Sequence, residues 1–148
     1  MFRMSKKLLY AIEAVLDIAY NAGSLPVQSK DITARQGIPR RYLEQVLQQL
    51  VRAGILSGVR GPRGGYLLAR ERRRITVGEI TRVVAMSETE DATEPPSDLG
   101  RRVVWPMWTG FEQEMMERLD TVTIEELCLR ANAKGITSEA AERLDFII

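Results

Sequence analysis

The chain has 148 residues, 45% of them hydrophobic and 28% charged, which suits one domain with a hydrophobic core of its own. It contains one cysteine and no histidine. This excludes a disulfide framework, the usual zinc sites and catalytic sets built on histidine. No apolar run is long enough to span a bilayer, and Glu13 and Asp17 interrupt the N-terminal one, so we expect a cytoplasmic protein with no membrane segment or signal peptide.

The net charge of +1 conceals an asymmetry along the chain. Residues 1–85 hold 15 Lys/Arg and 6 Asp/Glu, whereas residues 86–148 hold 6 Lys/Arg and 14 Asp/Glu. A basic half joined to an acidic half indicates one part that binds a polyanion such as DNA and another part with a different role. The alternative is that the two halves simply attract each other.

The first half predicts three helices. Apolar residues recur at helical spacing over 5–22, a short helix follows over 29–36, and a third helix over 39–53 begins with Pro39 in its first turn. Two helices joined by a short turn with glycine are typical of a helix-turn-helix. The outer face of the last helix is rich in Arg and Gln, which bind guanine and adenine edges, although a solvated face would have a similar composition.

Two β-like runs, 55–59 and 65–69, flank a tip that contains Arg60 and Arg63, which predicts a β-hairpin. A nucleotide-binding loop is excluded because Tyr66 stands where a P-loop needs Lys and Ser/Thr. A hairpin directly after a helix-turn-helix is typical of a wing, whose arginines reach phosphates or the minor groove. The alternative is a loose surface turn. The arginines over 70–74 are interpreted as a solvated edge that at most assists phosphate attraction.

The second half predicts a loop and further helices. Capping boxes at 76–79 and 123–126 predict two helix starts. The acidic segment 87–100 predicts a loop or linker, and the C-terminal tail, from residue 138 onward, has the pattern of one more amphipathic helix. Residues 101–122 predict a long helix with an apolar stripe, which suits a dimer interface or packing onto the first helix. The stripe consists of Trp108, Phe111, Met115, Leu119 and Val122.

The predicted fold class is mainly α with a small β-hairpin wing. We expect a winged helix-turn-helix domain over 1–86, the acidic loop over 87–100, and a long dimerisation helix with C-terminal helices over 101–148.

Three stretches, IPRRYLEQVLQQLVRAGIL, VRGPRGGYLLAR and ITVGEITRVV, occur in an order that resembles the bacterial winged helix-turn-helix regulators typified by IscR, NsrR and CymR. The resemblance runs from Ser5 to Leu127. It implies a homodimer with a long crossing helix and two wings on a near-palindromic operator in double-stranded DNA. Arg40, Arg41 and Glu44 would then enter the major groove, and Arg60 would lead the wing contact. The full set of candidate DNA contacts is Lys6, Lys7, Ser29, Arg40, Arg41, Tyr42, Glu44, Gln45, Gln48, Arg60 and Arg63.

Many members of that family sense iron–sulfur status, nitric oxide or redox state through three cysteines after the wing. Here the corresponding segment 87–100 has no cysteine, and Cys128 lies well beyond it. We therefore expect no conventional iron–sulfur cluster and no metal site, and any cluster would need unusual ligands. Cluster-free relatives such as CymR imply that DNA binding does not depend on those cysteines. No paired carboxylates or nucleophile–base set indicates an enzyme.

Three alternatives concern the signal. The chain could instead be a protein-interaction module, or a regulator controlled by a partner protein that binds its acidic half. Cys128 is interpreted as a buried apolar residue, with a redox-sensing thiol as the alternative. Trp105 and Trp108 could line a small-ligand pocket between subunits. The sequence leaves open the operator, the effector and whether binding represses or activates.

Overall fold

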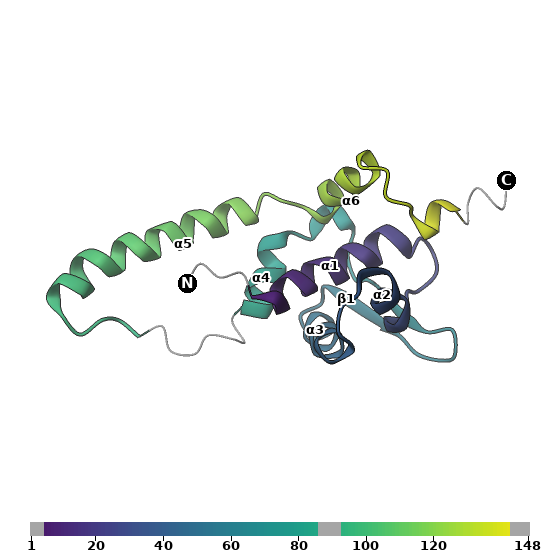
Figure 1. Cartoon of the computed structure of the whole chain (residues 1–148), viewed down its shortest axis with the longest axis horizontal. Coiled ribbons are helices and arrows are strands. Elements are labelled where there is room, and N and C mark those ends of the chain that lie inside the picture. Colours follow the sequence, from purple (N-terminus) through teal and green to yellow (C-terminus); the bar gives the residue numbers. More distant parts are fainter. Residues whose placement is uncertain (1–4, 86–92, 143–148) are drawn as a thin grey trace.

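The computed structural model describes residues 5–85 and 93–142 of the chain. A rounded body carries one long helix, α5, that extends away from it (Figure 1). The elements are α1 (Lys6–Asn21), α2 (Ser29–Gln36), α3 (Arg40–Arg52), β1 (Leu56–Val59), β2 (Gly65–Leu68), the 3-10 turn η1 (Arg72–Arg74), α4 (Val77–Ala85), the π-helical turn η2 (Gly100–Val104), α5 (Trp105–Leu119) and α6 (Ile124–Ala133). The predicted fold class, mainly helical with a small antiparallel hairpin, is confirmed.

Helix α1 forms the centre of the core. Leu8, Val15 and Ile18 recur at helical spacing and are all buried. The helix contacts α2, α3, α4, α6 and β2. Burial of an aliphatic side chain contributes about 1.5–3 kcal/mol. Helix α1 therefore supplies the apolar surface that holds the surrounding elements together.

A three-residue turn joins α2 to α3. Gly37 has a φ of +67°, the left-handed conformation that commonly ends a helix, and its amide donates to the Thr33 carbonyl at 2.9 Å. Ile38 is fully buried and fixes the turn on the core. Pro39 is predicted in the first helical turn but occupies the N-cap of α3, where its carbonyl accepts from the Leu43 amide at 3.1 Å.

The predicted wing hairpin is present. Strand β1 pairs antiparallel with β2, with Val59 opposite Gly65. Val27, just before α2, bridges to Tyr66 through two backbone hydrogen bonds of 3.0 and 2.8 Å. A Cβ on Gly65 would lie 2.4 Å from the Val27 carbonyl oxygen, so this approach requires glycine. The wing is thereby tied to the start of the helix-turn-helix.

Both threonines of the predicted capping boxes cap their helices, while the side chains of Glu79 and Glu126 pair with Arg70 and Arg130. The hydroxyls of Thr76 and Thr123 each accept from the amide three residues later, those of Glu79 and Glu126, at 3.1 Å. Helices α4 and α6 therefore begin where the sequence predicts them.

Helix α4 meets the C-terminal end of α5 in a contact that we call the α4–α5 joint. Arg82 of α4 donates two hydrogen bonds of 2.6 Å to Asp120, directly after α5. The Val77 amide donates to the Val122 carbonyl at 2.9 Å. A Cβ on Gly78 would lie 1.9 Å from Asp120 Oδ1, so glycine is needed for the close approach. The joint fixes the direction of α5 relative to the winged domain.

The helix that includes α5 begins earlier than predicted. Helical conformation starts at residue 98 and continues through η2 to the end of α5, so the last three residues of the predicted loop 87–100 are helical. The cause is Ser97, whose hydroxyl accepts from the Gly100 amide at 3.0 Å in an N-cap arrangement. Residues 87–92 of that predicted loop lie outside the described residues.

The chain after α6 returns to the end of α1. The Ser138 hydroxyl donates to the Tyr20 carbonyl, and the Glu139 amide donates to Asn21 Oδ1 at 3.0 Å. Residues 139–142 begin the helix predicted in the tail, and residues 143–148 lie outside the described residues.

Candidate nucleic-acid interface

Polar side chains occupy the outer face of α3, opposite the buried leucines and valine of that helix. The exposed set is Arg40, Arg41, Glu44, Gln45 and Gln48. Guanidinium, amide and carboxylate groups on one face match the hydrogen-bonding edges of guanine, adenine and cytosine. Arg40 Nε donates to Glu44 Oε1 at 3.1 Å, with the two side chains 81% and 57% exposed. Such an exposed pair contributes less than about 1 kcal/mol, so either group can exchange its partner for DNA at small cost.

Tyr42 restrains Arg41. The Arg41 guanidinium lies 4.9 Å from the Tyr42 ring centroid, and its Nη2 donates to the Tyr42 hydroxyl at 3.2 Å. The Tyr42 ring in turn contacts the Tyr10 ring, with centroids 5.9 Å apart. Stacking on a held ring limits the orientations of the guanidinium and lowers the entropy lost on binding. Tyr42 is itself half-buried beside the exposed face rather than on it.

A shallow hollow joins the N-terminal end of α1 to α3. Lys7, Gln45 and Gln48 line it together with Gln49 and Arg52. The fold thus brings Lys7 next to two candidates, Gln45 and Gln48, that lie 38 and 41 positions later, and Lys6 is exposed beside Lys7 in the chain. The cations Lys7 and Arg52 of this hollow suit a backbone phosphate beside the glutamines of α3.

The wing tip presents Arg60 and Arg63, both exposed. Gln28, at the N-cap of α2, places its Nε2 3.5 Å from the Pro62 carbonyl, which joins the tip to the start of α2. Ser29, the first residue of α2, directly follows Gln28 and is half-buried, so it lies beside the wing tip. Gln28 is missing from the sequence prediction, because nothing in the local pattern signals a contact 34 residues away.

A buried carboxylate sets the position of α2. Asp17 of α1 accepts from Arg35 Nε and Nη2 at 2.9 and 2.8 Å and from Gln36 Nε2 at 2.8 Å. The hydrogen bond to Asp17 is the main cause that raises the pKa of the Arg35 guanidinium above its ordinary value, so this side chain stays charged. The sequence prediction treats Asp17 only as an interruption of an apolar run. Its place on the buried face of a helix is the signal that could have revealed a partner.

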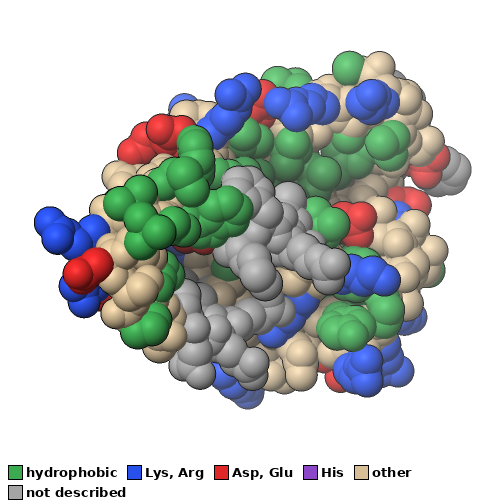
Figure 2. All heavy atoms as spheres, turned by 60° about the vertical axis from the view of Figure 1, so that its left-hand side comes forward, with side chains coloured by type: hydrophobic (Ala, Val, Ile, Leu, Met, Phe, Trp, Pro, Cys, Tyr) green, Lys and Arg blue, Asp and Glu red, His purple; other side chains and the backbone are tan. Residues whose placement is uncertain are grey.

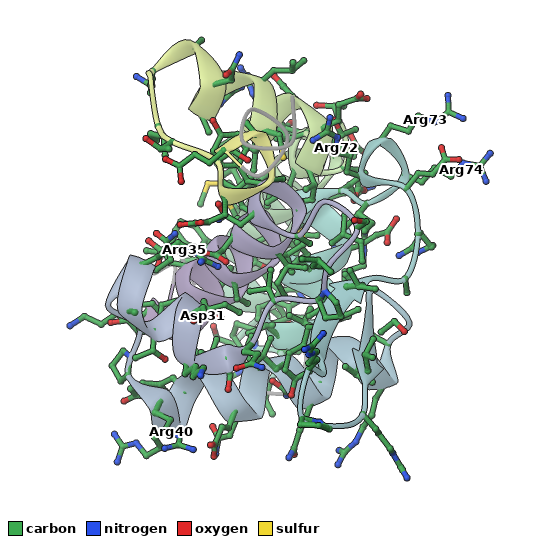
Figure 3. The ribbon with its side chains drawn as sticks, turned by 90° about the vertical axis from the view of Figure 1, so that its right-hand side faces the viewer. Asp31, Arg35, Arg40, Arg72, Arg73 and Arg74 are labelled. Atoms are coloured by element: carbon green, nitrogen blue, oxygen red, sulfur yellow. The ribbon has the colours of Figure 1, made fainter. Side chains whose placement is uncertain are left out.

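The arginine cluster after the wing does not join the α3 surface. Figure 3 shows Arg40 at one end of the domain and Arg72, Arg73 and Arg74 toward the other, with Arg73 and Arg74 pointing outward. The predicted role in phosphate attraction therefore finds no support in their position.

Helix α5 contains no buried residue, although it carries most of the predicted apolar stripe. Phe111 and Met115 are exposed, while Trp108, Leu119 and Val122 are half-buried, and Val122 lies in the turn after the helix. Figure 2 shows hydrophobic side chains gathered on this side of the molecule. Packing onto α1, the alternative considered from the sequence, does not bury the stripe. Further exposed apolar residues of this region are Leu99, Val103, Val104 and Met107.

Cys128 is 4% exposed and belongs to the core. Burial raises the pKa of its thiol, an effect that the neighbouring Arg72 only partly offsets. A buried, protonated thiol is a poor nucleophile, so the surroundings of Cys128 favour its interpretation as a small apolar residue.

Comparisons with known proteins agree with this geometry. Residues 4–130 match the profile of the family Rrf2, described as iron-dependent transcriptional regulator. The transcriptional regulator IscR of Xenorhabdus nematophila is 38% identical over 130 residues, which cover 84% of this chain and 78% of that protein. The IscR of Klebsiella pneumoniae (strain 342) is 37% identical over the same shares.

Solved structures show the same fold. T. potens IscR matches with a TM-score of 0.72 and 36% identity, covering 88% of each chain. CymR, the global cysteine regulator of B. subtilis, also matches with a TM-score of 0.72, at 28% identity, covering 88% of this chain and 98% of its own. Within the described ranges, no helix combines the length and apolar character needed to cross a membrane. The chain belongs to the Rrf2 family, whose members are DNA-binding transcriptional regulators rather than enzymes.

Proposed function

We propose that the chain binds a near-palindromic operator as a homodimer, with α3 in the major groove and the wing on the flanking backbone. Three features support the base-reading part: the exposed face of α3, the restrained Arg41 and the tie between wing and α2. Arg41 and Arg40 would pair with guanine edges, Gln45 and Gln48 with adenine, and Glu44 with a cytosine amino group. Lys6, Lys7, Ser29, Arg60 and Arg63 would contact phosphates and so set the register, while Tyr42 would hold Arg41 in place.

The exposed apolar surface of α5 is the observation that carries the homodimer. Phe111 is 49% exposed and Met107 is 53% exposed in the single chain. Each large apolar side chain contributes about 1.5–3 kcal/mol when fully buried, and aromatic residues and Met are enriched at interfaces. A two-fold axis through a pair of such helices would present two α3 helices to the two halves of a palindrome.

Fluorescence anisotropy with DNA from upstream of the chain's own gene tests base reading. Arg41→Ala should weaken binding by about 1–3 kcal/mol on the specific site and much less on random DNA. Arg130→Ala is the matched control, because this exposed arginine pairs with Glu126 on α6, which lies on the other side of α1 from α3 (Figure 1). A wild-type protein that binds specific and random DNA equally would contradict the proposal.

Sedimentation equilibrium tests the dimer. Phe111→Glu should shift the chain from dimer to monomer, because it places a charge in the proposed apolar interface. Leu25→Glu, at a residue that is also exposed but lies outside α5, should remain a dimer. A wild-type chain that stays monomeric at micromolar concentration would rule out the proposed assembly.

The residues do not fit a conventional iron–sulfur cluster. The chain has one cysteine, and it is buried in α6. Among the described residues, no group of three or more His, Cys, Asp or Glu side chains could hold a metal ion. We propose that this regulator works without such a cluster. Anaerobically purified protein should show no visible absorption from iron–sulfur charge transfer, and a coloured protein with bound iron would refute this.

A further inference from the structure

A cavity of about 720 Å³ lies between the end of α1, strand β2, η1 and α6. Ile18, Ala19, Ala22, Leu67 and Leu68 line it with apolar side chains. Its volume is within the range of about 300–1,000 Å³ typical of small-ligand sites. The rim includes Arg72, toward the opposite end of the domain from Arg40 (Figure 3), so the cavity is separate from the proposed DNA contacts.

Two of the three arginines on the rim have carboxylate partners. Arg70 forms an ion pair with Glu79, which lies outside the cavity lining. Arg73 Nε donates to Glu71 Oε2 at 2.5 Å. These guanidinium groups are therefore partly neutralised before any ligand arrives.

Arg72 differs from both neighbours. No carboxylate of a described residue lies within 4.0 Å of its guanidinium, which instead lies next to the Cys128 sulfur. Glu125 of α6 is the remaining acidic group of the rim, and it too has no ion pair among the described residues. The rim thus offers one guanidinium without a carboxylate partner, beside an apolar wall, and Glu125 as its carboxylate without an ion pair among the described residues.

We propose that this cavity binds a small monocarboxylic acid with an apolar body. The planar guanidinium of Arg72 suits a carboxylate, which it holds through two parallel hydrogen bonds. The apolar body would cover the half-buried side chains of Leu67 and Leu68 and remove them from water. Glu125 disfavours a second negative charge on the ligand, which selects against dicarboxylates. The site needs neither DNA nor a second subunit.

The test uses octanoate as the probe on the full chain without DNA, followed by ¹H–¹⁵N NMR. Saturable shifts are expected at the amides of Ala22, Leu67 and Leu68, which line the cavity. Octan-1-ol and octylamine, with the same apolar body, should bind at least about tenfold more weakly, because a charge-assisted hydrogen bond is worth at least that factor.

Variants separate the contribution of the charged side chains from that of the apolar cavity. Arg72→Gln should weaken octanoate binding about tenfold or more, whereas Arg74→Gln, a neighbouring arginine outside the cavity lining, should leave it unchanged. Glu125→Gln should strengthen octanoate binding, because it removes a like charge. Ala19→Phe should abolish binding by filling the cavity without changing any charge, which keeps the test valid if Arg72→Gln fails to fold.

Three results would overturn the proposal. Shifts that are absent or lie away from the cavity would remove the site. Equal affinity for octanoate and octan-1-ol would remove the role of Arg72. Weaker octanoate binding in Glu125→Gln would show that Glu125 supports the bound carboxylate instead of repelling it, and would remove the proposed selection against a second negative charge. Each of these measurements is made without DNA, so failure of the operator proposal would not affect the proposal of a carboxylic-acid site.

Discussion

Replacing Asp17 with alanine tests whether a buried ion pair holds the helix-turn-helix on the core. The change removes the acceptor of three hydrogen bonds, of 2.8–2.9 Å, from Arg35 and Gln36. The Asp17 side chain is fully buried and that of Arg35 is 26% exposed. Loss of one partner of a buried pair costs about 3–5 kcal/mol. Because Arg35 can turn partly toward water, we expect a loss of about 2–4 kcal/mol in the free energy of unfolding.

Urea unfolding followed by circular dichroism, at one fixed protein concentration, measures this loss. The same change should lower Tm by roughly 6–12 °C for a chain of this size. Arg130→Ala, which breaks an exposed pair with Glu126, should cost less than about 1 kcal/mol. In the double-mutant cycle, Asp17→Ala and Arg35→Ala should couple by at least about 1 kcal/mol. A loss for Asp17→Ala as small as that of the control, at an unchanged m-value, would refute the reasoning.

Three further predictions concern the wing, the α4–α5 joint and the cysteine. Gly65→Ala should weaken DNA binding and lower the free energy of unfolding by about 1–3 kcal/mol. Its Cβ would collide with the Val27 carbonyl and break the two backbone hydrogen bonds between Val27 and Tyr66. Unchanged operator affinity would contradict this prediction. Arg82 lowers the pKa of the Asp120 carboxyl, so the pair stabilises the fold above about pH 4 and this contribution is lost as the pH falls through the lowered pKa. The stability difference between wild type and Asp120→Asn should therefore narrow in urea titrations below that pH, and a constant difference would argue against the pair. Cys128 should react with iodoacetamide far more slowly in the native protein than in denaturant, and equal rates would show that its thiol is accessible.

Local signals in the sequence predict most of the fold. Thr76 and Thr123 each stand three residues before a glutamate, and both cap their helices as expected. Gly37 ends α2 as expected, because the left-handed φ at this position favours glycine. The start of the helix that leads into α5 is misplaced because Pro-Pro and acidic residues hide the cap at Ser97. Such boundaries depend on one hydrogen bond, which composition does not reveal.

Long-range contacts escape the sequence altogether. Asp17 accepts a hydrogen bond from Arg35, 18 positions later, and the Ser138 hydroxyl donates to the Tyr20 carbonyl, 118 positions earlier. For the candidate site, periodicity places the exposed residues of α3 correctly, but it does not reveal the ring of Tyr42 beneath Arg41. The arginines over 70–74 look uniform in the sequence, yet the structure gives Arg70, Arg72 and Arg73 different partners.

The α4–α5 joint has a geometric consequence for operator choice. If two chains meet through α5, the distance between their α3 helices depends on the angle at which each α5 leaves its winged domain. Gly78, Arg82 and Asp120 hold that angle at one point, so a small rotation there would be magnified along the helix. A chain with a looser joint, such as Arg82→Ala, should accept operators whose half-sites are one base pair closer or farther apart.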